Sequence, residues 1–311
     1  MKELLAQLAT HAIKLWLKEG RLQVSAPPGV LTPALRDQLA LHKAELLALL
    51  QQQTTLQPIP RAAHQGLAPL SYAQQRLWFL TQLQPTGTAY HLATLLHLRG
   101  HLVLPALQQS LTTLVERHEI LRTTYTVVDG VPMQCIGAPQ PVTITEIDLT
   151  ALPLAQQRPA VITRTQQEQA RGFDLAHGPL WRFLLFHLAE QSSKLAMIMH
   201  HLITDEWSTG ILLREISACY TAFVKQQAVQ LPPLAIQYAD YAIWQQQQLA
   251  TPHWQQQLAD WQQALHDAPT RLQLPVDQPP VATPTMRAAA VYLEIDARLT
   301  ATLKSLAQAA D

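Results

Sequence analysis

The chain has 311 residues with 22 basic and 22 acidic side chains, so its formal net charge at pH 7 is zero. This balance leaves no excess of positive charge that would indicate binding to nucleic acid or to an anionic membrane. No apolar run approaches the roughly 20 residues of a membrane span. Two lone cysteines provide neither a disulfide framework nor zinc-ligand spacing, and the ten glycines form no phosphate loop or dinucleotide fingerprint. The N-terminus lacks the apolar stretch of a signal peptide, so we expect a cytoplasmic protein.

Residues 1–52 have the pattern of a small separate unit. An amphipathic helix begins at Leu4, Leu5 and Leu8, and residues 13–18 alternate in polarity as a strand does. A turn at Glu19-Gly20 would lead into a second strand over 22–24, and Thr32-Pro33 predicts an N-cap with proline at the first helical position. The expected order is helix, hairpin, helix. The last helix would have an apolar face of Leu35, Leu39, Leu46 and Leu50.

A linker is expected over residues 53–68, followed by a larger unit over 69–265 that mixes helices and strands. Ser71 to Gln74 form a capping-box pattern, apolar spacing predicts a helix over 105–121, and Asp129-Gly130 predicts a hairpin turn. Further strands are expected at 90–98, 183–188 and 194–201, and a glutamine-rich helical stretch at 238–265.

Residues 266–311 are expected to form a second linker and the start of a truncated C-terminal lobe. The proline-rich stretch 275–284 would be the linker. A strand over 291–295 and a helix that stops at Asp311 would follow.

Residues 200–208, His-His-Leu-Ile-Thr-Asp-Glu-Trp-Ser, carry the most chemical information. A continuous apolar run precedes them, as in a strand buried on both faces, and a helical pattern follows with Ser208 or Thr209 as the expected N-cap. One interpretation is a buried histidine pair with a capping aspartate. A metal site is disfavoured because no third or fourth ligand is arranged nearby. The third interpretation is acyl transfer with one imidazole as the proton acceptor.

A second polar segment, Arg-His-Glu-Ile-Leu-Arg-Thr-Thr at 117–124, closes the predicted helix over 105–121. We expect His118 to be a core-facing imidazole satisfied by backbone groups. The planar guanidinium of Arg122 suits bidentate binding of a carboxylate. Asp205 is its expected partner, because an unpaired buried carboxylate costs several kcal/mol.

Taken in order, these segments resemble the core motifs of the condensation domains of nonribosomal peptide synthetases. The first motif is similar to residues 71–80 and the second to residues 117–124. The active-site motif, usually written HHxxxDG, is similar to residues 200–208, and the fourth motif to residues 238–244. Phe173-Asp174-Leu175 with Gly178-Pro179-Leu180 matches another common run. Five short motifs in the expected order are far more specific than any one alone.

The resemblance implies an α/β (α+β) fold like chloramphenicol acetyltransferase, in which each of two lobes is a mixed sheet with flanking helices. It implies that an acceptor aminoacyl thioester on one carrier protein attacks a donor acyl or peptidyl thioester on another. His201 would be the active-site histidine, as base or as positioner of the amine, in a catalytic motif with His200 and Asp205. Asp205 would be structural and paired with Arg122. No cofactor would bind directly, since phosphopantetheine would arrive on the carrier proteins.

One position departs from the family pattern, because Glu206 stands where the family has glycine. Glycine permits positive φ and a close approach of the backbone. A glutamate either keeps ordinary backbone angles and points to solvent, or strains the backbone and changes activity or acceptor choice. Trp207 and Ser208, the next two residues, would support the site together with Glu206 and Arg122.

Residues 1–52 resemble the N-terminal docking domains of the tubulysin-synthetase (TubC-like) type. Such domains use a helix–hairpin–helix unit to capture the C-terminal tail of the preceding synthetase subunit. An exposed hairpin edge would take the tail by strand addition. The hairpin residues Lys14, Trp16, Lys18 and Arg21 would contact the tail, and their basic members would favour an acidic one. A solvated charged face is the alternative.

The leading hypothesis is a docking domain followed by the first lobe of a condensation domain, with little condensation by this chain alone because the family's tunnel lies between lobes. One alternative is a catalytically inactive docking or binding module. Another is a glycerolipid-type acyltransferase, because His200 and Asp205 also fit an HxxxxD pattern. The other condensation motifs and the missing membrane-binding pattern weigh against that alternative.

Overall fold

The computed structural model describes residues 4, 8, 13–18, 21–27, 30–47, 58–84, 87–269, 272, 275 and 293–310. Within these residues no helix is long and apolar enough to cross a membrane. Leu5, the Glu19-Gly20 turn, Leu50 and the predicted linker at 276–284 lie outside the described residues.

The N-terminal unit contains the predicted hairpin and second helix. Strands β1 (Lys14–Lys18) and β2 (Arg21–Ser25) pair antiparallel, and α2 (Pro33–Leu41) follows. The Thr32 hydroxyl accepts the backbone N–H of Leu35 at 3.3 Å, which confirms the predicted N-cap. The unit has a hydrophobic core of its own, formed by Leu4, Leu8, Ile13, Leu35, Leu39 and Leu46.

The larger unit is built on a four-stranded sheet that is mixed, as predicted, although its strand at residues 144–148 was not predicted. Its strands are β4 (His91–Arg99), β7 (Ile144–Asp148), β8 (Trp181–Ala189) and β9 (Ser192–His200). The spatial order is β4-β9-β8-β7, with β7 and β8 parallel and the other pairs antiparallel.

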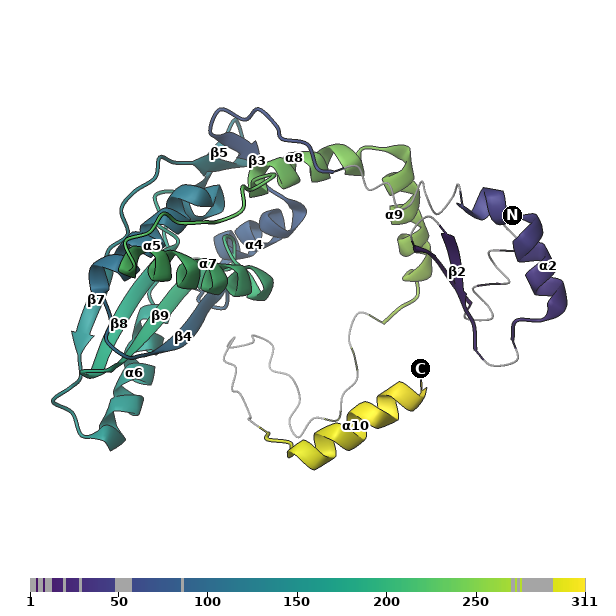
Figure 1. The fold of residues 1–311 in the computed structure, drawn as a ribbon. Coiled ribbons are helices and arrows are strands. Elements are labelled where there is room, and N and C mark those ends of the chain that lie inside the picture. Colours follow the sequence, from purple (N-terminus) through teal and green to yellow (C-terminus); the bar gives the residue numbers. More distant parts are fainter. Residues whose placement is uncertain are drawn as a thin grey trace.

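Both faces of this sheet are buried, and alternate side chains of β8 and β9 enter two different cores. One core contains Leu185 and Met197 with the helices α5 (Leu104–Arg117) and α7 (Glu206–Val224). The other contains Phe186 and Ile198 with α6 (Leu154–Gln169). Figure 1 shows α5 and α7 on one face of the sheet and α6 on the other. Burial on both faces explains the continuous apolar run that precedes His200.

A second, three-stranded sheet lies beside the first, with the order β3-β6-β5. Its strands are β3 (Leu67–Pro69), β5 (Thr123–Val128) and β6 (Val131–Ile136). Asp129 and Gly130 join β5 to β6 with φ of 50° and 80°. Positive φ at both positions is the geometry of a tight hairpin turn, so the predicted turn is confirmed.

Several predicted boundaries differ from the structure. The helix expected over 105–121 ends at Arg117 and continues as a 3₁₀ turn, η1 (Glu119–Arg122). The helical stretch at 238–265 is two helices, α8 (Tyr238–Leu249) and α9 (Pro252–Ala264), because Pro252 begins a new one. The strand expected at 291–295 was wrong over residues 293–295, which form none, and α10 (Ala297–Ala310) follows them.

The described part of the expected linker, residues 58–68, lies against the larger unit. Arg61 donates to the carbonyl oxygens of Leu234 and Ala235 at 2.8 and 3.0 Å, and the backbone N–H of Ala62 donates to Asp240 at 2.8 Å. Residues 67 and 68 already belong to β3. These contacts tie the beginning of the larger unit to α8, near its other end.

Truncation of Leu185 to alanine tests the double-sided burial of the sheet. Leu185 is completely buried, so we expect the free energy of unfolding to fall by about 2–5 kcal/mol. Urea unfolding followed by circular dichroism measures the change. The matched control is Leu154→Ala on α6, where the side chain is 84% exposed and the expected change is within about 0.5 kcal/mol. Equal losses in the two variants would contradict the packing described above.

Candidate active site

His201 is the first residue after β9, where the strand turns toward α7. Its backbone N–H donates to the carbonyl oxygen of Tyr90 at 2.8 Å, and its ring Nδ1 lies 2.9 Å from the carbonyl oxygen of Thr204. A carbonyl oxygen only accepts, so Nδ1 carries the proton and Nε2 of the neutral ring keeps its lone pair. The ring is half-buried and fixed in one orientation by its own loop.

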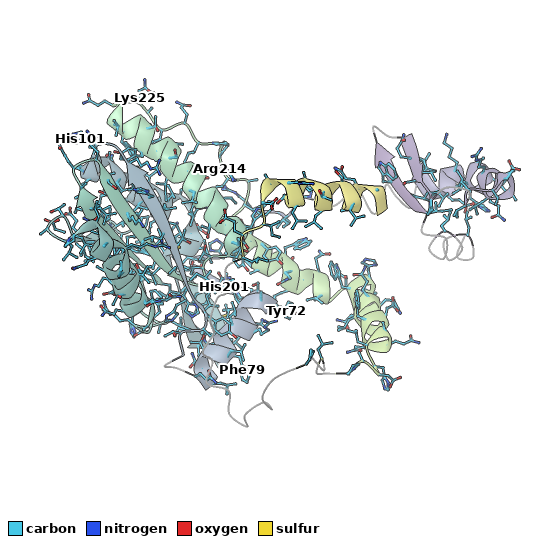
Figure 2. All side chains as sticks on the ribbon, turned by 90° about the horizontal axis from the view of Figure 1, so that it is seen from below. Tyr72, Phe79, His101, His201, Arg214 and Lys225 are labelled. Atoms are coloured by element: carbon cyan, nitrogen blue, oxygen red, sulfur yellow. The ribbon has the colours of Figure 1, made fainter. Side chains whose placement is uncertain are left out.

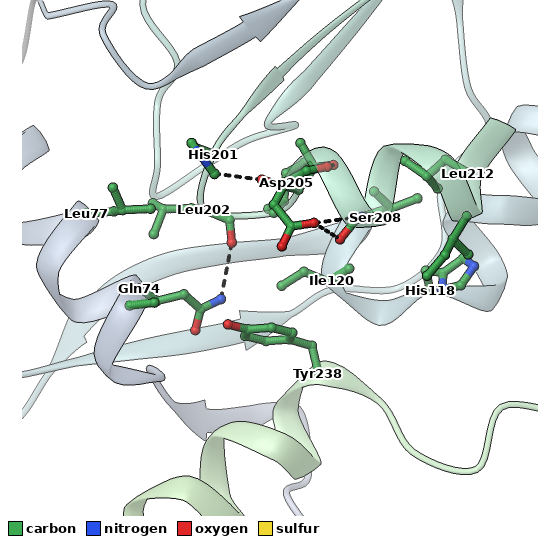
Figure 3. A pocket seen from close by; sticks show the side chains of 15 residues that line it. Gln74, Leu77, His118, Ile120, His201, Leu202, Asp205, Ser208, Leu212 and Tyr238 are labelled. Carbon is green, nitrogen blue, oxygen red and sulfur yellow. Dashed lines mark hydrogen bonds between the residues drawn. The ribbon is translucent and has the colours of Figure 1, made fainter. Parts of the chain in front are cut away.

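The ring of His201 lines a cavity of about 230 Å³. Figure 3 shows this cavity, and Figure 2 shows His201 at the end of the unit where α4 (Tyr72–Leu83) carries Tyr72 and Phe79. Most of the wall is apolar, with a few polar groups converging on it, as in small-molecule sites. The side chains of the wall with polar groups are Gln74, His118, His201, Thr204, Asp205, Ser208 and Tyr238.

His200 points to the opposite face of the sheet and does not line this cavity. It is 1% exposed, and the backbone N–H of Leu202 donates to its Nδ1 at 3.1 Å. His91 is its cross-strand partner, and the two rings pack edge to face beside Phe173. Burial, followed by the nearby His91 and His201, lowers the pKa of His200 to about 3. A neutral, buried His200 supports the strand and has no access to a substrate in the cavity.

Gln74 and Tyr125 hold the loop that follows His201. The Tyr125 hydroxyl donates to the carbonyl oxygen of Leu202 at 2.9 Å, and Nε2 of Gln74 donates to the same oxygen at 3.2 Å. Nε2 of Gln74 also donates to the Tyr125 hydroxyl at 2.9 Å. The other end of the Gln74 amide accepts the backbone N–H of Ser71 and completes the predicted capping box. Sequence reasoning found Gln74 only as a capping residue and missed Tyr125.

Asp205 is the N-cap of α7, so the expected cap at Ser208 or Thr209 was wrong. Its Oδ1 accepts the backbone N–H and the hydroxyl of Ser208 at 2.7 and 2.6 Å. The hydroxyl of Ser208, followed by its backbone N–H and the charge of His201, lowers the pKa of Asp205. The carboxylate therefore stays ionised at the start of the helix, where the macrodipole favours it.

The predicted ion pair between Arg122 and Asp205 does not form. Arg122 donates to Gly137 O and to Oε1 of Glu119, the latter at 3.4 Å, and it lines a different cavity. Asp205 is exposed and takes both of its donors from Ser208. A carboxylate in contact with water needs no cation, so the premise of a buried aspartate was wrong.

His118 lines the end of the cavity opposite Gln74 and Leu77 (Figure 3), and its expected backbone partner was also wrong. Its Nε2 lies 2.6 Å from Oε2 of Glu215, a carboxylate on α7 that also accepts from Arg117 at 3.2 Å. Glu215 was missed because its spacing in the sequence resembles that of any solvent-exposed helix position. The contact joins the second motif to α7.

Glu206 and Trp207 are exposed residues of the first turn of α7, the Trp207 side chain being 83% exposed. Glu206 has no positive φ, so the strained alternative for this position does not apply. Its carboxylate lies where the helix dipole favours negative charge. Of the three predicted supporting residues on α7, only Ser208 lines the cavity.

The fourth motif, together with Gln237 before it, supports the first two motifs, and its Tyr238 lies in the cavity wall. The hydroxyls of Tyr238 and Ser71 share a hydrogen bond of 2.9 Å, and burial raises the pKa of Tyr238. Gln237 accepts from the backbone N–H of Glu119 and donates to the carbonyl oxygen of Arg117, so α8 fixes the turn at His118. The described residues contain no cluster of three metal-ligating side chains.

Two protein families match the chain, one in each of its two parts, and together they leave out residues 53–63. The family described as "Condensation domain" matches residues 64–311, and the family described as "TubC N-terminal docking domain" matches residues 1–52. A linear gramicidin synthase of Brevibacillus parabrevis is 40% identical over 263 residues, which are 84% of this chain and 5% of that protein. Phosphinothricin tripeptide synthetase PhsC of Streptomyces viridochromogenes is 37% identical over 242 residues, which are 78% of this chain and 22% of that protein. The chain therefore spans a small part of these curated relatives.

Solved structures are similar over most of the chain. The X-domain from teicoplanin biosynthesis, solved in complex with OxyB, is 32% identical with a TM-score of 0.67, covering 79% of this chain and 55% of that chain. The EpoB cyclization-docking bidomain from Sorangium cellulosum has a TM-score of 0.69 and covers 89% of this chain and 55% of that chain. Its identity of 24% supports the shared fold alone.

The buried His200 predicts acid sensitivity of the fold. Its pKa is about 3 when folded and ordinarily 6.5, so below pH 6.5 only the unfolded state gains a proton. The free energy of unfolding should be fully retained above pH 6.5 and then fall by about 1.4 kcal/mol per pH unit from this group. His91, whose pKa burial also lowers, acts in the same direction.

Urea unfolding between pH 7.5 and 5.5 measures this slope. The variant His200→Asn keeps an acceptor for the N–H of Leu202 and should show a smaller slope. The control is His101→Asn, because the His101 side chain is 72% exposed and should leave the slope unchanged. An identical slope in His200→Asn and in the unmodified chain would refute the assignment.

Proposed function

The chain belongs to the condensation-domain family, and from that premise we propose that it takes part in amide-bond formation in a nonribosomal peptide synthetase. The donor would be an acyl or peptidyl thioester and the acceptor an aminoacyl thioester. Phosphopantetheine would reach the site on donor and acceptor carrier proteins. The N-terminal docking unit would recruit the upstream synthetase subunit.

The observation that carries the proposal is the fixed orientation of the His201 ring at the cavity wall. The hydrogen bond from Nδ1 to Thr204 leaves the lone pair of Nε2 for a substrate. The lone pair of a neutral imidazole nitrogen can take a proton from an attacking amine or accept a hydrogen bond from it. His200, buried on the other face, has no such role in this proposal.

In the proposed reaction the amine nitrogen of the acceptor forms a bond to the thioester carbonyl carbon of the donor, and the C–S bond breaks. The proton lost by nitrogen goes to Nε2 of His201 and from there to the leaving thiolate. A positioning role would use the same atom, with Nε2 accepting a hydrogen bond from the amine without taking the proton. Asp205 acts in either case by fixing the first turn of α7 beside the cavity.

Substitution of His201 by alanine tests the assignment in a protein that carries the whole condensation domain. Loss of a positioned base typically lowers a rate by about 10²–10⁴-fold, so we expect at least a 100-fold slower formation of the amide. Intact-mass detection of the product on the acceptor carrier protein measures the rate. A melting temperature of the His201→Ala variant equal to that of the unmodified protein would show that the fold is kept.

The matched control is His101→Ala, which lies at the other end of the unit in Figure 2 and should retain activity. Full activity of the His201→Ala variant would reject His201 as the reacting or positioning group.

Binding of the upstream tail tests the docking role. Trp16 is 44% exposed on β1, beside the hairpin edge that would receive the tail. The side chains of Lys14, Lys18 and Arg21 lie outside the described residues, so their contact with an acidic tail stays a prediction. We expect acidic C-terminal tail peptides to bind the full chain, and Trp16→Ala to weaken binding by about tenfold or more.

Fluorescence anisotropy of labelled tail peptides measures this affinity. Leu41→Ala is the matched control, because Leu41 is a 79% exposed apolar residue that belongs to α2 and not to the hairpin. Equal affinities for the Trp16→Ala variant and the unmodified chain would contradict the proposed surface.

A second candidate function is that of a binding module without amide-forming activity. Two observations favour it: Glu206 stands in the place of the family's glycine, and the X-domain of similar fold was solved in complex with OxyB. Absence of product with His201 intact, together with retained tail binding, would support this candidate over the enzyme.

A further inference from the structure

A second cavity of about 810 Å³ lies beside β7, at the edge of the four-stranded sheet. It shares Leu121 with the cavity at His201 but contains neither His201 nor Asp205. Four arginines line it, one from η1, two from the C-terminal part of α6 and the loop after it, and one from β8. We call this cavity the arginine cleft, after Arg122, Arg164, Arg171 and Arg182.

Positive charge exceeds negative charge on the α6 side of the arginine cleft. Arg164 and Arg171 share a single carboxylate, that of the buried Glu168, at 2.9 and 2.6 Å. Arg182 forms no ion pair within the described part of the chain. Three guanidinium groups therefore face one carboxylate, which leaves a surplus of two positive charges.

Arg182 is held in place by groups that carry no charge. Its Nη1 donates to the carbonyl oxygens of Glu168 and Arg171 at 3.1 Å each, its Nη2 donates to Gly172 O, and its guanidinium lies 4.0 Å from the centre of the Phe173 ring. These bonds use three of the five N–H groups of the guanidinium. Burial and the neighbouring charge of Arg171 lower the pKa of Arg182. The charge of Glu168 acts in the opposite direction, although no carboxylate of the described residues lies within ion-pair distance of Arg182.

Arg122, which enters the cleft from η1, has an incomplete set of partners. Its two Nη groups donate to Gly137 and Glu119, but its buried Nε–H has none. The remaining titratable group of the wall, His177, is already paired with Asp174 at 2.8 Å. The rings of Trp181 and Phe183, which lie 4.9 Å apart, are buried on the α5 face of the sheet, because these residues alternate with Arg182 along β8.

We propose that the arginine cleft binds a small phosphomonoester, with its phosphate group on the surplus guanidiniums of the α6 side. A dianionic phosphomonoester matches the surplus of two charges, whereas a carboxylate would neutralise only one. Planar guanidinium groups bind phosphate oxygens in pairs. The site is separate from the proposed amide-forming reaction and does not depend on it.

Isothermal titration calorimetry of the full chain tests the cleft with three probes. Phenyl phosphate combines the anion with an aromatic ring, inorganic phosphate presents the anion alone, and phenylacetate replaces phosphate by carboxylate. We expect saturable binding of one phenyl phosphate per chain, about tenfold or more tighter than phenylacetate, and competition by inorganic phosphate for the same site. Absence of saturable heat, or phenylacetate binding as tightly as phenyl phosphate, would overturn the proposal.

Two single variants localise the binding. Arg171→Gln leaves Glu168 paired with Arg164, and Arg164→Gln leaves it paired with Arg171, so the buried carboxylate keeps one partner in each. Each should weaken phenyl phosphate binding by about tenfold at an unchanged melting temperature. Arg158→Gln is the control, an exposed arginine of α6 outside the cleft. An equal loss in Arg158→Gln, or no loss in either cleft variant, would refute the site.

Discussion

Hydrogen bonds to the carbonyl oxygen of Leu202 bring separate segments of this chain together in one site. This oxygen accepts from Tyr125 on β5 and from Gln74 on α4, so two elements far apart in sequence fix the loop that carries His201. Both donors are buried, and a buried carbonyl without them would be costly. The same Gln74 amide completes the cap of α4, which joins the start of that helix to the cavity wall. The loop geometry is thus a property of the larger unit and not of the loop sequence.

Strand periodicity separates the roles of the two adjacent histidines. Along β9, Met197 and Met199 enter one core while Ile198 enters the other, and His200 continues the second set. His200 therefore packs against its cross-strand partner His91 and stays neutral. His201 lies beyond the last ladder position, where the chain turns and the ring reaches the cavity. A shift of one residue in register would exchange these environments, so the proposed role of His201 depends on the register of β9 with β4.

The parts of the fold that rest on local chemistry could be predicted from the sequence. The capping box at Ser71, the Asp129-Gly130 turn and the cap at Thr32 each depend on residues within four positions, and the structure contains all three. The Glu215 partner of His118 and the Tyr125 bond to Leu202 depend on tertiary packing across many residues. Polarity and spacing carry no signal for such pairs. The helix end at Arg117 was missed because the apolar spacing continues through Leu121 although the backbone changes to a 3₁₀ turn.

The predicted ion pair between Asp205 and Arg122 was wrong because hydrogen-bond donors close in sequence compete with a distant cation. A carboxylate at the start of a helix has donors within three residues, whereas a distant guanidinium must be brought to it by the fold. Ser208 supplies two donors at 2.6 and 2.7 Å, and the helix dipole adds to them, so Asp205 gains little from Arg122. The same dipole accounts for Glu206, since a carboxylate in the first turn is stabilised without any positive φ. Replacing the family's glycine by glutamate is therefore compatible with the helix start beside His201, and any effect on the reaction would come from the added charge near the cavity and not from backbone strain.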